Sequence, residues 1–201
     1  MSEAVKELSY KPSPGAIGKA IPRWVGRLAL FVTGRWLFLA NSLAFTLIAL
    51  PVLAPWLMAL GATLPARVIY FCYRFLCHQM PSRSYFVFGY QLAICQRDLA
   101  IYASILLAGL LFCSIRNRIE PLRWWLYLLL VTPMAIDSLS QFLGWRESNW
   151  QWRTLAGGLF GVANVALVYP FLERGMQEAR ASLIREQGGY DGNGTRSKAR
   201  A

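Results

Sequence analysis

The sequence predicts an all-α, polytopic membrane protein with four transmembrane helices and a short interfacial or re-entrant helix between the first and the second. Composition is the first reason, because 56% of the 201 residues are hydrophobic and only 15% are charged. A water-soluble domain of this size could not bury so much apolar surface in one core. The second reason is that the chain contains four apolar runs of 17 residues or more. Each run is long enough to cross a hydrocarbon layer about 30 Å thick.

The expected spans are separated by short connections. The first contains Pro51 and Pro55, which a membrane helix tolerates. By contrast, residues 67–79 would reach only about 20 Å as a helix, because each residue adds about 1.5 Å. We expect these residues to form the interfacial or re-entrant helix. The four spans are expected at about residues 36–60, 99–115, 122–143 and 154–172.

Three segments follow from this division. Residues 1–35 are expected to be a basic, amphipathic cytoplasmic leader, residues 36–173 a four-helix transmembrane domain, and residues 174–201 a basic, partly disordered cytoplasmic tail. The net charge of +11 does not indicate nucleic acid, because much of it lies in the two terminal segments. The expected partners are the lipid bilayer and, at the basic termini, anionic lipids.

The distribution of lysine and arginine predicts the orientation. With four spans, 15 of the 21 basic residues fall on the side that holds both termini, and 6 fall on the other side. Because the cytoplasmic side of a membrane protein is enriched in positive charge, both termini are expected in the cytoplasm. The six residues expected on the outer side are Arg67, Arg74, Arg83, Arg97, Arg146 and Arg153.

Residues that can bind a transition metal gather on this outer side. Cys77 and His78 are adjacent, His78 is the only histidine, and Cys95 and Asp98 follow with a Cys-x-x-Asp spacing. Thiolate, imidazole and carboxylate are the side chains that bind zinc and iron, so these four residues are candidate metal ligands. Two alternatives stay open. Cys77 and Cys95 face an oxidising compartment and could form a disulfide, and Asp98 could cap the following helix.

A second polar group is expected beside these residues. Asp137 and Gln141 lie one helical turn apart in the third span. An ionised carboxylate inside the membrane is costly unless it is paired, so Asp137 should face a cation. Arg97 and Arg153, at the outer starts of the second and fourth spans, are the expected partners. The expected pocket and second shell consist of Arg83, Arg97, Asp137, Gln141, Glu147 and Arg153.

The fourth span carries a helix-packing signal. Gly157-x-x-x-Gly161 provides a groove of small residues that lets another helix approach closely. Asn164 lies three residues further on and is expected to hydrogen-bond a neighbouring helix. The sequence does not decide whether that helix belongs to this chain or to another.

Two motifs resemble those of an uncharacterised family of prokaryotic integral membrane proteins. One is Cys77-His78-Gln79-x-Pro81-x-Arg83-Ser84 with Cys95-x-Arg97, and the other runs from Pro133 to Asp137 and on to Arg153. In that family a third cysteine ends a Cys-x-Arg-Cys motif, and Asp98 stands at that position here. The resemblance implies a prokaryotic cytoplasmic membrane and a metal or redox site. With Asp98 in place of the third cysteine, it implies for this chain either a site of mixed sulfur, nitrogen and oxygen ligands or a scaffold that has lost the site. It implies no reaction.

Three functions are compatible with these features. The first is a membrane protein of undetermined reaction with a metal or redox site on the extracytoplasmic face. The second is an accessory or structural subunit of a larger membrane complex, with a Cys77–Cys95 disulfide. The third is a small transporter that works as a homo-oligomer. Hydrolase and nucleotide-binding motifs are not present in the sequence, so whether the protein is an enzyme stays open.

Overall fold

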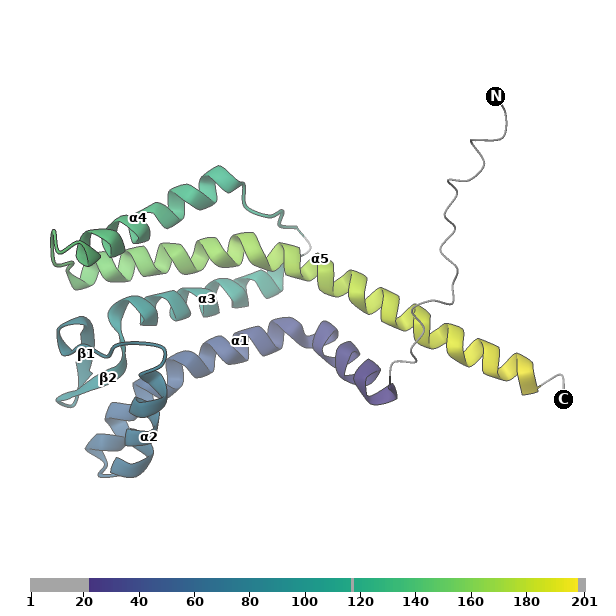
Figure 1. The fold of residues 1–201 in the computed structure, drawn as a ribbon, viewed down its shortest axis with the longest axis horizontal. Coiled ribbons are helices and arrows are strands. Elements are labelled where there is room, and N and C mark those ends of the chain that lie inside the picture. Colours follow the sequence, from purple (N-terminus) through teal and green to yellow (C-terminus); the bar gives the residue numbers. More distant parts are fainter. Residues whose placement is uncertain (1–21, 117, 199–201) are drawn as a thin grey trace.

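The computed structural model describes residues 22–116 and 118–198, and 77% of these residues are helical. Helices α1, α3, α4 and α5 lie side by side, with α3 between α1 and α5, and with α4 against α5 (Figure 1). A short helix, α2, and a two-stranded hairpin lie together at one end of this bundle. The elements are α1 (Arg23–Ala59), α2 (Thr63–Tyr73), β1 (Ser84–Val87), β2 (Tyr90–Cys95), α3 (Gln96–Ile115), α4 (Trp124–Phe142) and α5 (Trp150–Lys198).

Three of these helices are long and apolar enough to cross a membrane. The qualifying stretches are Trp24–Ala59, Gln96–Ile115 and Trp150–Arg185, within α1, α3 and α5. Helix α4 lies where the third span was expected, yet it is not among them. Its first half is apolar, but its last two turns carry four polar residues. These residues are Asp137, Ser138, Ser140 and Gln141.

The β-hairpin departs from the all-α expectation. Strands β1 and β2 pair antiparallel, with Val87 opposite Tyr90. Phe88 and Gly89 form the turn between them with φ values of 53° and 79°, and two successive positive φ angles are typical of the type I′ turn that joins tight hairpins. Phe88 also packs edge-on against Trp56 of α1, with ring centroids 4.7 Å apart. The turn of the hairpin therefore packs against α1.

Helix α2 begins and ends earlier than the sequence suggested. It covers Thr63–Tyr73 instead of residues 67–79. Tyr73 is buried against α1 and donates a hydrogen bond to the carbonyl of Thr46. Leu64 and Phe71 are largely exposed, as expected for an apolar helix whose outer face meets lipid. Because α2 ends at Tyr73, the Cys-His segment lies in an irregular connection and not on a helix.

The two terminal segments are described in part. Residue Arg35 has non-helical angles (φ −125°, ψ 16°), so it separates residues 23–34 from the rest of α1. The first 21 residues of the expected leader lie outside the described part of the chain. At the other terminus α5 continues to Lys198, well beyond the ends of α1 and α3 (Figure 1). Residues 174–198, which the sequence assigned to the tail, therefore continue helix α5.

The packing signal in α5 faces α3 of the same chain. A Cβ atom on Gly161 would lie 2.6 Å from the carbonyl oxygen of Ile101, and one on Gly157 would lie 2.7 Å from that of Arg97. Only glycine permits this approach. Asn164 donates to Phe160 O within α5 and accepts from the Tyr127 hydroxyl of α4 at 3.5 Å.

Candidate metal centre

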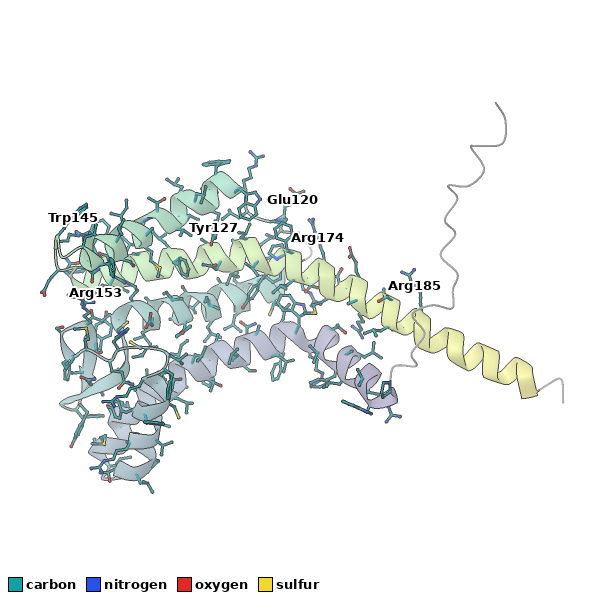
Figure 2. The ribbon with its side chains drawn as sticks, viewed as in Figure 1. Glu120, Tyr127, Trp145, Arg153, Arg174 and Arg185 are labelled. Carbon is teal, nitrogen blue, oxygen red and sulfur yellow. The ribbon has the colours of Figure 1, made fainter. Side chains whose placement is uncertain are left out.

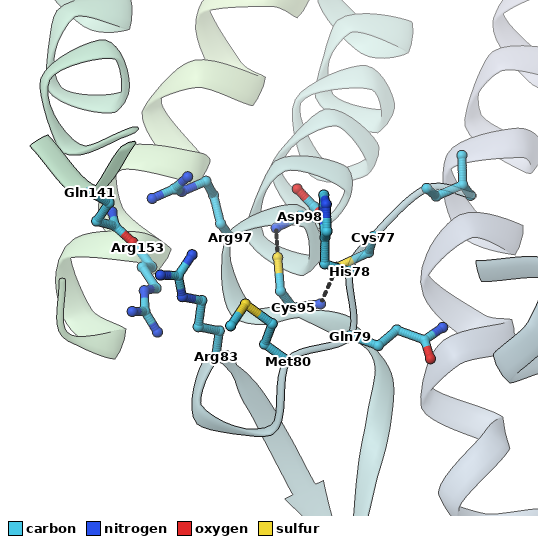
Figure 3. Close-up of a pocket in the computed structure, with 11 residues that line it drawn as sticks. Cys77, His78, Gln79, Met80, Arg83, Cys95, Arg97, Asp98, Gln141 and Arg153 are labelled. Atoms are coloured by element: carbon cyan, nitrogen blue, oxygen red, sulfur yellow. Dashed lines mark hydrogen bonds between the residues drawn. The ribbon is translucent and has the colours of Figure 1, made fainter. Parts of the chain in front are cut away.

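A cavity of about 500 Å³ lies beside the hairpin, where α3 begins and α4 and α5 meet (Figure 3). Its walls come from the connection after α2, the end of β2 and three helix ends. The lining residues therefore come from segments far apart in the sequence. They include most of the residues that the sequence predicted for a functional site. The lining residues are Leu76, Cys77, His78, Gln79, Met80, Arg83, Cys95, Arg97, Asp98, Gln141 and Arg153.

Three expected metal ligands meet at one side of the cavity. The sulfur atoms of Cys77 and Cys95 are 3.6 Å apart, and both cysteines are free thiols. One carboxylate oxygen of Asp98 completes a group whose ligand atoms all lie within 4.8 Å of one another. Cys77 is buried, whereas Cys95 and Asp98 are half-buried. Two sulfurs and one oxygen at these separations can share one metal ion.

Backbone amides support both sulfur atoms. The N–H of Cys95 donates to Cys77 Sγ at 3.2 Å, and the N–H of Asp98 donates to Cys95 Sγ at 3.5 Å. The second bond makes the Cys95 thiol the N-cap of α3. Asp98, the other possible cap of this helix, lies in its first turn instead. Amide donors stabilise negative charge on sulfur, which favours the thiolate form that binds metals.

The two thiols differ in acidity. The hydrogen bond from Cys95, helped by the amides of Gln79 and Cys95, lowers the pKa of Cys77 to about 7 despite its burial. The same hydrogen bond, together with burial, raises the pKa of Cys95. The pair therefore shares one proton near neutral pH, with the negative charge on Cys77.

The connection that carries Cys77 is held by a closed set of hydrogen bonds. Gln79 donates through Nε2 to the carbonyl of Tyr70 at 2.7 Å, and Gln91 donates through Nε2 to the carbonyl of Gln79 at 2.9 Å. The Tyr70 hydroxyl in turn donates to the carbonyl of Gln91. These bonds tie α2, the connection and β2 together. They fix Cys77 beside Cys95 at the end of the strand.

His78 lines the cavity but stands apart from the cluster of three. It is exposed, and it is not a member of the group that lies within 4.8 Å. In Figure 3 its ring is drawn on the same side of the cavity as Asp98 and the two sulfurs.

Asp137 is buried beneath the cavity and forms two ion pairs. Its Oδ2 accepts from Arg97 Nη2, and its Oδ1 accepts from Arg146 Nη2 at 3.0 Å. Arg97 also donates to the Ser138 hydroxyl at 3.0 Å, and Gln141 donates to Asp137 Oδ2 at 2.8 Å. Of the two expected partners, Arg97 therefore holds the carboxylate and Arg153 does not. The second ion pair of Asp137 is formed by Arg146, in the loop between α4 and α5.

Arg153 is bound to neutral groups. It is 6% exposed, and its Nη1 lies 3.3 Å from the Ser82 carbonyl and 3.5 Å from Gln96 Oε1. Arg83 is half-buried and lines the same cavity. Glu147 is exposed and lies outside the cavity lining. The expected pocket thus contains the arginines and Gln141 but not Glu147.

Several contributors were not foreseen from the sequence. Gln96 is buried at 8% exposure and accepts from Arg153, and Met80 and Leu76 complete the cavity wall. The hairpin itself left a signal: aromatic and aliphatic residues flank Phe88-Gly89, which is the pattern of two strands around a tight turn. No comparable signal marks Gln96, because a polar residue at a helix start usually faces water.

Comparison with known proteins agrees with a membrane protein. The sequence profile of the family described as "Predicted membrane protein (DUF2085)" matches residues 77–167, a stretch that includes every cavity-lining residue except Leu76. An uncharacterized protein of Methanocaldococcus jannaschii is 34% identical over 126 residues, covering 59% of this chain and 80% of that protein. Another, from Methanothermobacter thermautotrophicus, is 34% identical over 77 residues, covering 38% and 69%. No solved structure matches.

The archaeal relative from Methanocaldococcus is similar over most of its own length, and the family profile begins at Cys77, the first residue of the thiol cluster. The similarity therefore spans the cavity and the helices that build it. This chain belongs to the DUF2085 family of predicted membrane proteins.

Proposed function

We propose that this membrane protein binds a transition metal ion, zinc or iron, at the extracytoplasmic end of its helix bundle. The ligands are the thiolates of Cys77 and Cys95, the carboxylate of Asp98 and the imidazole of His78. The observation that carries the proposal is the 3.6 Å separation of the two sulfurs with a carboxylate oxygen nearby. Two sulfurs on one tetrahedral zinc, each about 2.3 Å from the ion, are separated by about 3.8 Å.

Neighbouring side chains would support such a centre. Arg97 forms part of the cavity wall next to Asp98, and its guanidinium is held by Asp137 and Ser138. Gln141 is held by the same carboxylate. A buried network of this kind fixes the geometry around metal ligands and controls the access of solvent. With Cys77, Cys95 and Asp98 alone, a tetrahedral ion would keep one position open to the cavity for a small molecule, whereas coordination by His78 would close the site.

The proposed orientation places four transmembrane helices, α1, α3, α4 and α5, with α2 at the outer interface. Figure 2 shows Trp145 and Arg153 at the end of the bundle with the hairpin, and Glu120, Arg174 and Arg185 toward the other end or beyond it. The connection between α3 and α4, at the end away from the hairpin, contains Arg116 and Arg118, so basic residues concentrate there. This distribution favours that end as the cytoplasmic one. Polar groups at the outer end of α4 face Arg97 and Arg146, which supports its insertion.

A redox-active dithiol is the second candidate function. It is favoured by the lowered pKa of Cys77, because a thiolate at neutral pH is the form that attacks a disulfide. In this case Cys77 and Cys95 would exchange with the disulfide of a partner protein. The accessory-subunit hypothesis includes a Cys77–Cys95 disulfide, whereas both cysteines are free thiols in the structure.

Metal analysis of the purified full chain tests the proposal. We expect about one zinc or iron ion per chain in the wild type, and a loss of most of it in Cys77→Ser and Cys95→Ser. Cys72→Ser is the matched control, since Cys72 is exposed and outside the cavity; it should retain the metal. Negligible metal in the wild type, or equal metal in all variants, would overturn the proposal. Reversible Cys77–Cys95 oxidation in a metal-free protein would favour the dithiol instead.

A further inference from the structure

The side of the cavity opposite the thiols is formed by arginines, and two of them lack an anionic partner. Arg97 is paired with Asp137. Among the residues that the structure describes, no carboxylate lies within 4.0 Å of the Arg83 or Arg153 guanidinium. The cavity wall contains one carboxylate, that of Asp98, and it lies on the thiol side (Figure 3). The arginine side therefore carries uncompensated positive charge.

Burial makes this charge costly. Arg153 is only 6% exposed to solvent. Its hydrogen-bond acceptors are the backbone carbonyl of Ser82 and the side-chain amide oxygen of Gln96. A guanidinium that has lost most of its water is stabilised far better by an anion than by neutral acceptors. Arg83 contributes a second guanidinium to the same cavity. Two arginines that line one cavity are suited to the bidentate recognition of an oxyanion.

The distribution of unpartnered polar atoms points to the same place. Within the described residues, four buried side-chain nitrogen or oxygen atoms have no hydrogen-bond partner in the protein. Three of them belong to residues that line this cavity, namely Arg97 Nε, Arg153 Nε and Gln141 Oε1. Buried polar groups are satisfied in nearly all proteins, so such atoms usually mark the position of a ligand or an ordered solvent molecule. Two of the three are N–H donors, which suit an oxyanion.

We propose that this cavity binds a small oxyanion, that is a carboxylate, phosphate or sulfonate group, between Arg83 and Arg153. The rest of the bound molecule would extend toward Cys77 and Cys95. This is the same cavity as that of the proposed metal site. The anion site rests on the proposed function only in sharing this location. The anion would be held by the arginines whether or not a metal is bound. A free phosphate and the headgroup of an anionic lipid have the same chemistry and are distinguished below.

Calorimetric titration of the full chain in a non-ionic detergent, with inorganic phosphate as the probe, tests the proposal. We expect saturable binding by the wild type, weakened at least about tenfold in Arg83→Gln and in Arg153→Gln, because each removes a charge-assisted contact. Arg67→Gln is the control, since Arg67 is an exposed arginine of the same side of the bundle outside the cavity; it should bind phosphate like the wild type. Absence of phosphate binding, or equal binding by Arg83→Gln and the wild type, would overturn the proposal.

Two further arms separate the outcomes. Should Arg153→Gln fail to fold, the half-buried Arg83 carries the test alone. Cys77→Ser should lose metal but keep phosphate binding, so failure of the metal site and failure of the anion site give different results. Repeating the titration after adding phosphatidylglycerol identifies the source. If added phosphatidylglycerol abolishes phosphate binding by the wild type, the site binds a lipid headgroup. If phosphate binding is unchanged, the site binds a soluble anion. If the lipid reduces phosphate binding equally in Arg83→Gln and the wild type, the proposed site is contradicted.

Discussion

At the scale of single residues, the two thiols of the cavity have opposite tendencies because of one hydrogen bond. Cys95 donates to Cys77, which lowers the pKa of Cys77 and raises that of Cys95. Amide donors add to the effect at Cys77. A metal ion would replace the shared proton and keep both sulfurs as thiolates, so metal binding should release a proton.

This asymmetry predicts the pH dependence of alkylation in the metal-free protein. Because the pKa of Cys77 is about 7, its reaction with iodoacetamide should increase through pH 7, while Cys95 reacts slowly below pH 9. Replacing Cys95 by alanine removes the side-chain donor and weakens the stabilisation of the thiolate, so the midpoint for Cys77 should move to higher pH. Mass spectrometry of the modified peptides measures both midpoints. A Cys77 midpoint near 9 in the wild type would contradict this assignment.

The buried carboxylate of Asp137 predicts a large effect on stability. Asp137→Asn removes the charge that compensates Arg97, so we expect the free energy of unfolding to fall by about 3–5 kcal/mol. Arg146→Gln is the matched comparison. Its side chain is 47% exposed, so its loss should cost only about 0–1 kcal/mol. Thermal unfolding in detergent measures both. Equal shifts for the two variants would show that the ion pair with Arg97 is not the important one.

At the scale of the elements, the hairpin and the α3–α5 contact place the site. The hairpin delivers Cys95 to the start of α3, and the glycines of α5 bring Arg153 close to that same helix end. The long apolar helices were predictable, because their composition alone requires a membrane. The ends of α2 were not, because Gln79 hydrogen-bonds Tyr70 and Gln91, and contacts between separate segments leave no local pattern in the sequence. The hairpin does have a local pattern around Phe88-Gly89, but it is short beside the long apolar runs.

The close approach of α5 to α3 gives a test with an internal control. A methyl group on Gly161 would collide with the Ser104 hydroxyl and the Ile101 carbonyl, whereas one on Gly158 would meet nothing within 4 Å. Gly161→Ala should therefore destabilise the protein by about 1–3 kcal/mol. Gly158→Ala should be neutral or stabilise it by up to about 1 kcal/mol, because alanine favours helix. Comparable melting temperatures for the two variants would contradict the packing described here.

At the scale of the whole molecule, the cavity lies at one end of a helix bundle whose basic residues concentrate toward the other end. The sequence predicted that Cys77, Cys95, Asp98 and the arginines would gather at one end. It could not predict which arginine pairs with Asp137, because that choice depends on the path of the loop that carries Arg146. The exposed position of His78 likewise follows from the irregular connection after α2.

The proposed orientation predicts which loops are reached from outside the cell. In a background with the four cysteines replaced by serine, Trp145→Cys in the α4–α5 loop should react with a membrane-impermeant maleimide on intact cells. Arg118→Cys, in the loop at the other end of the bundle, should react only after permeabilisation. Both positions are exposed, so access is decided by the membrane. The reverse pattern of labelling would invert the orientation.

X-ray absorption at the metal edge of the purified protein shows directly whether Cys77 and Cys95 bind one metal ion together. We expect two sulfur neighbours at about 2.3 Å from zinc, with oxygen or nitrogen neighbours at about 2.0–2.2 Å, and loss of both sulfur neighbours when Cys77 and Cys95 are replaced together. A metal surrounded only by oxygen and nitrogen, with both thiols still open to alkylation, would contradict it.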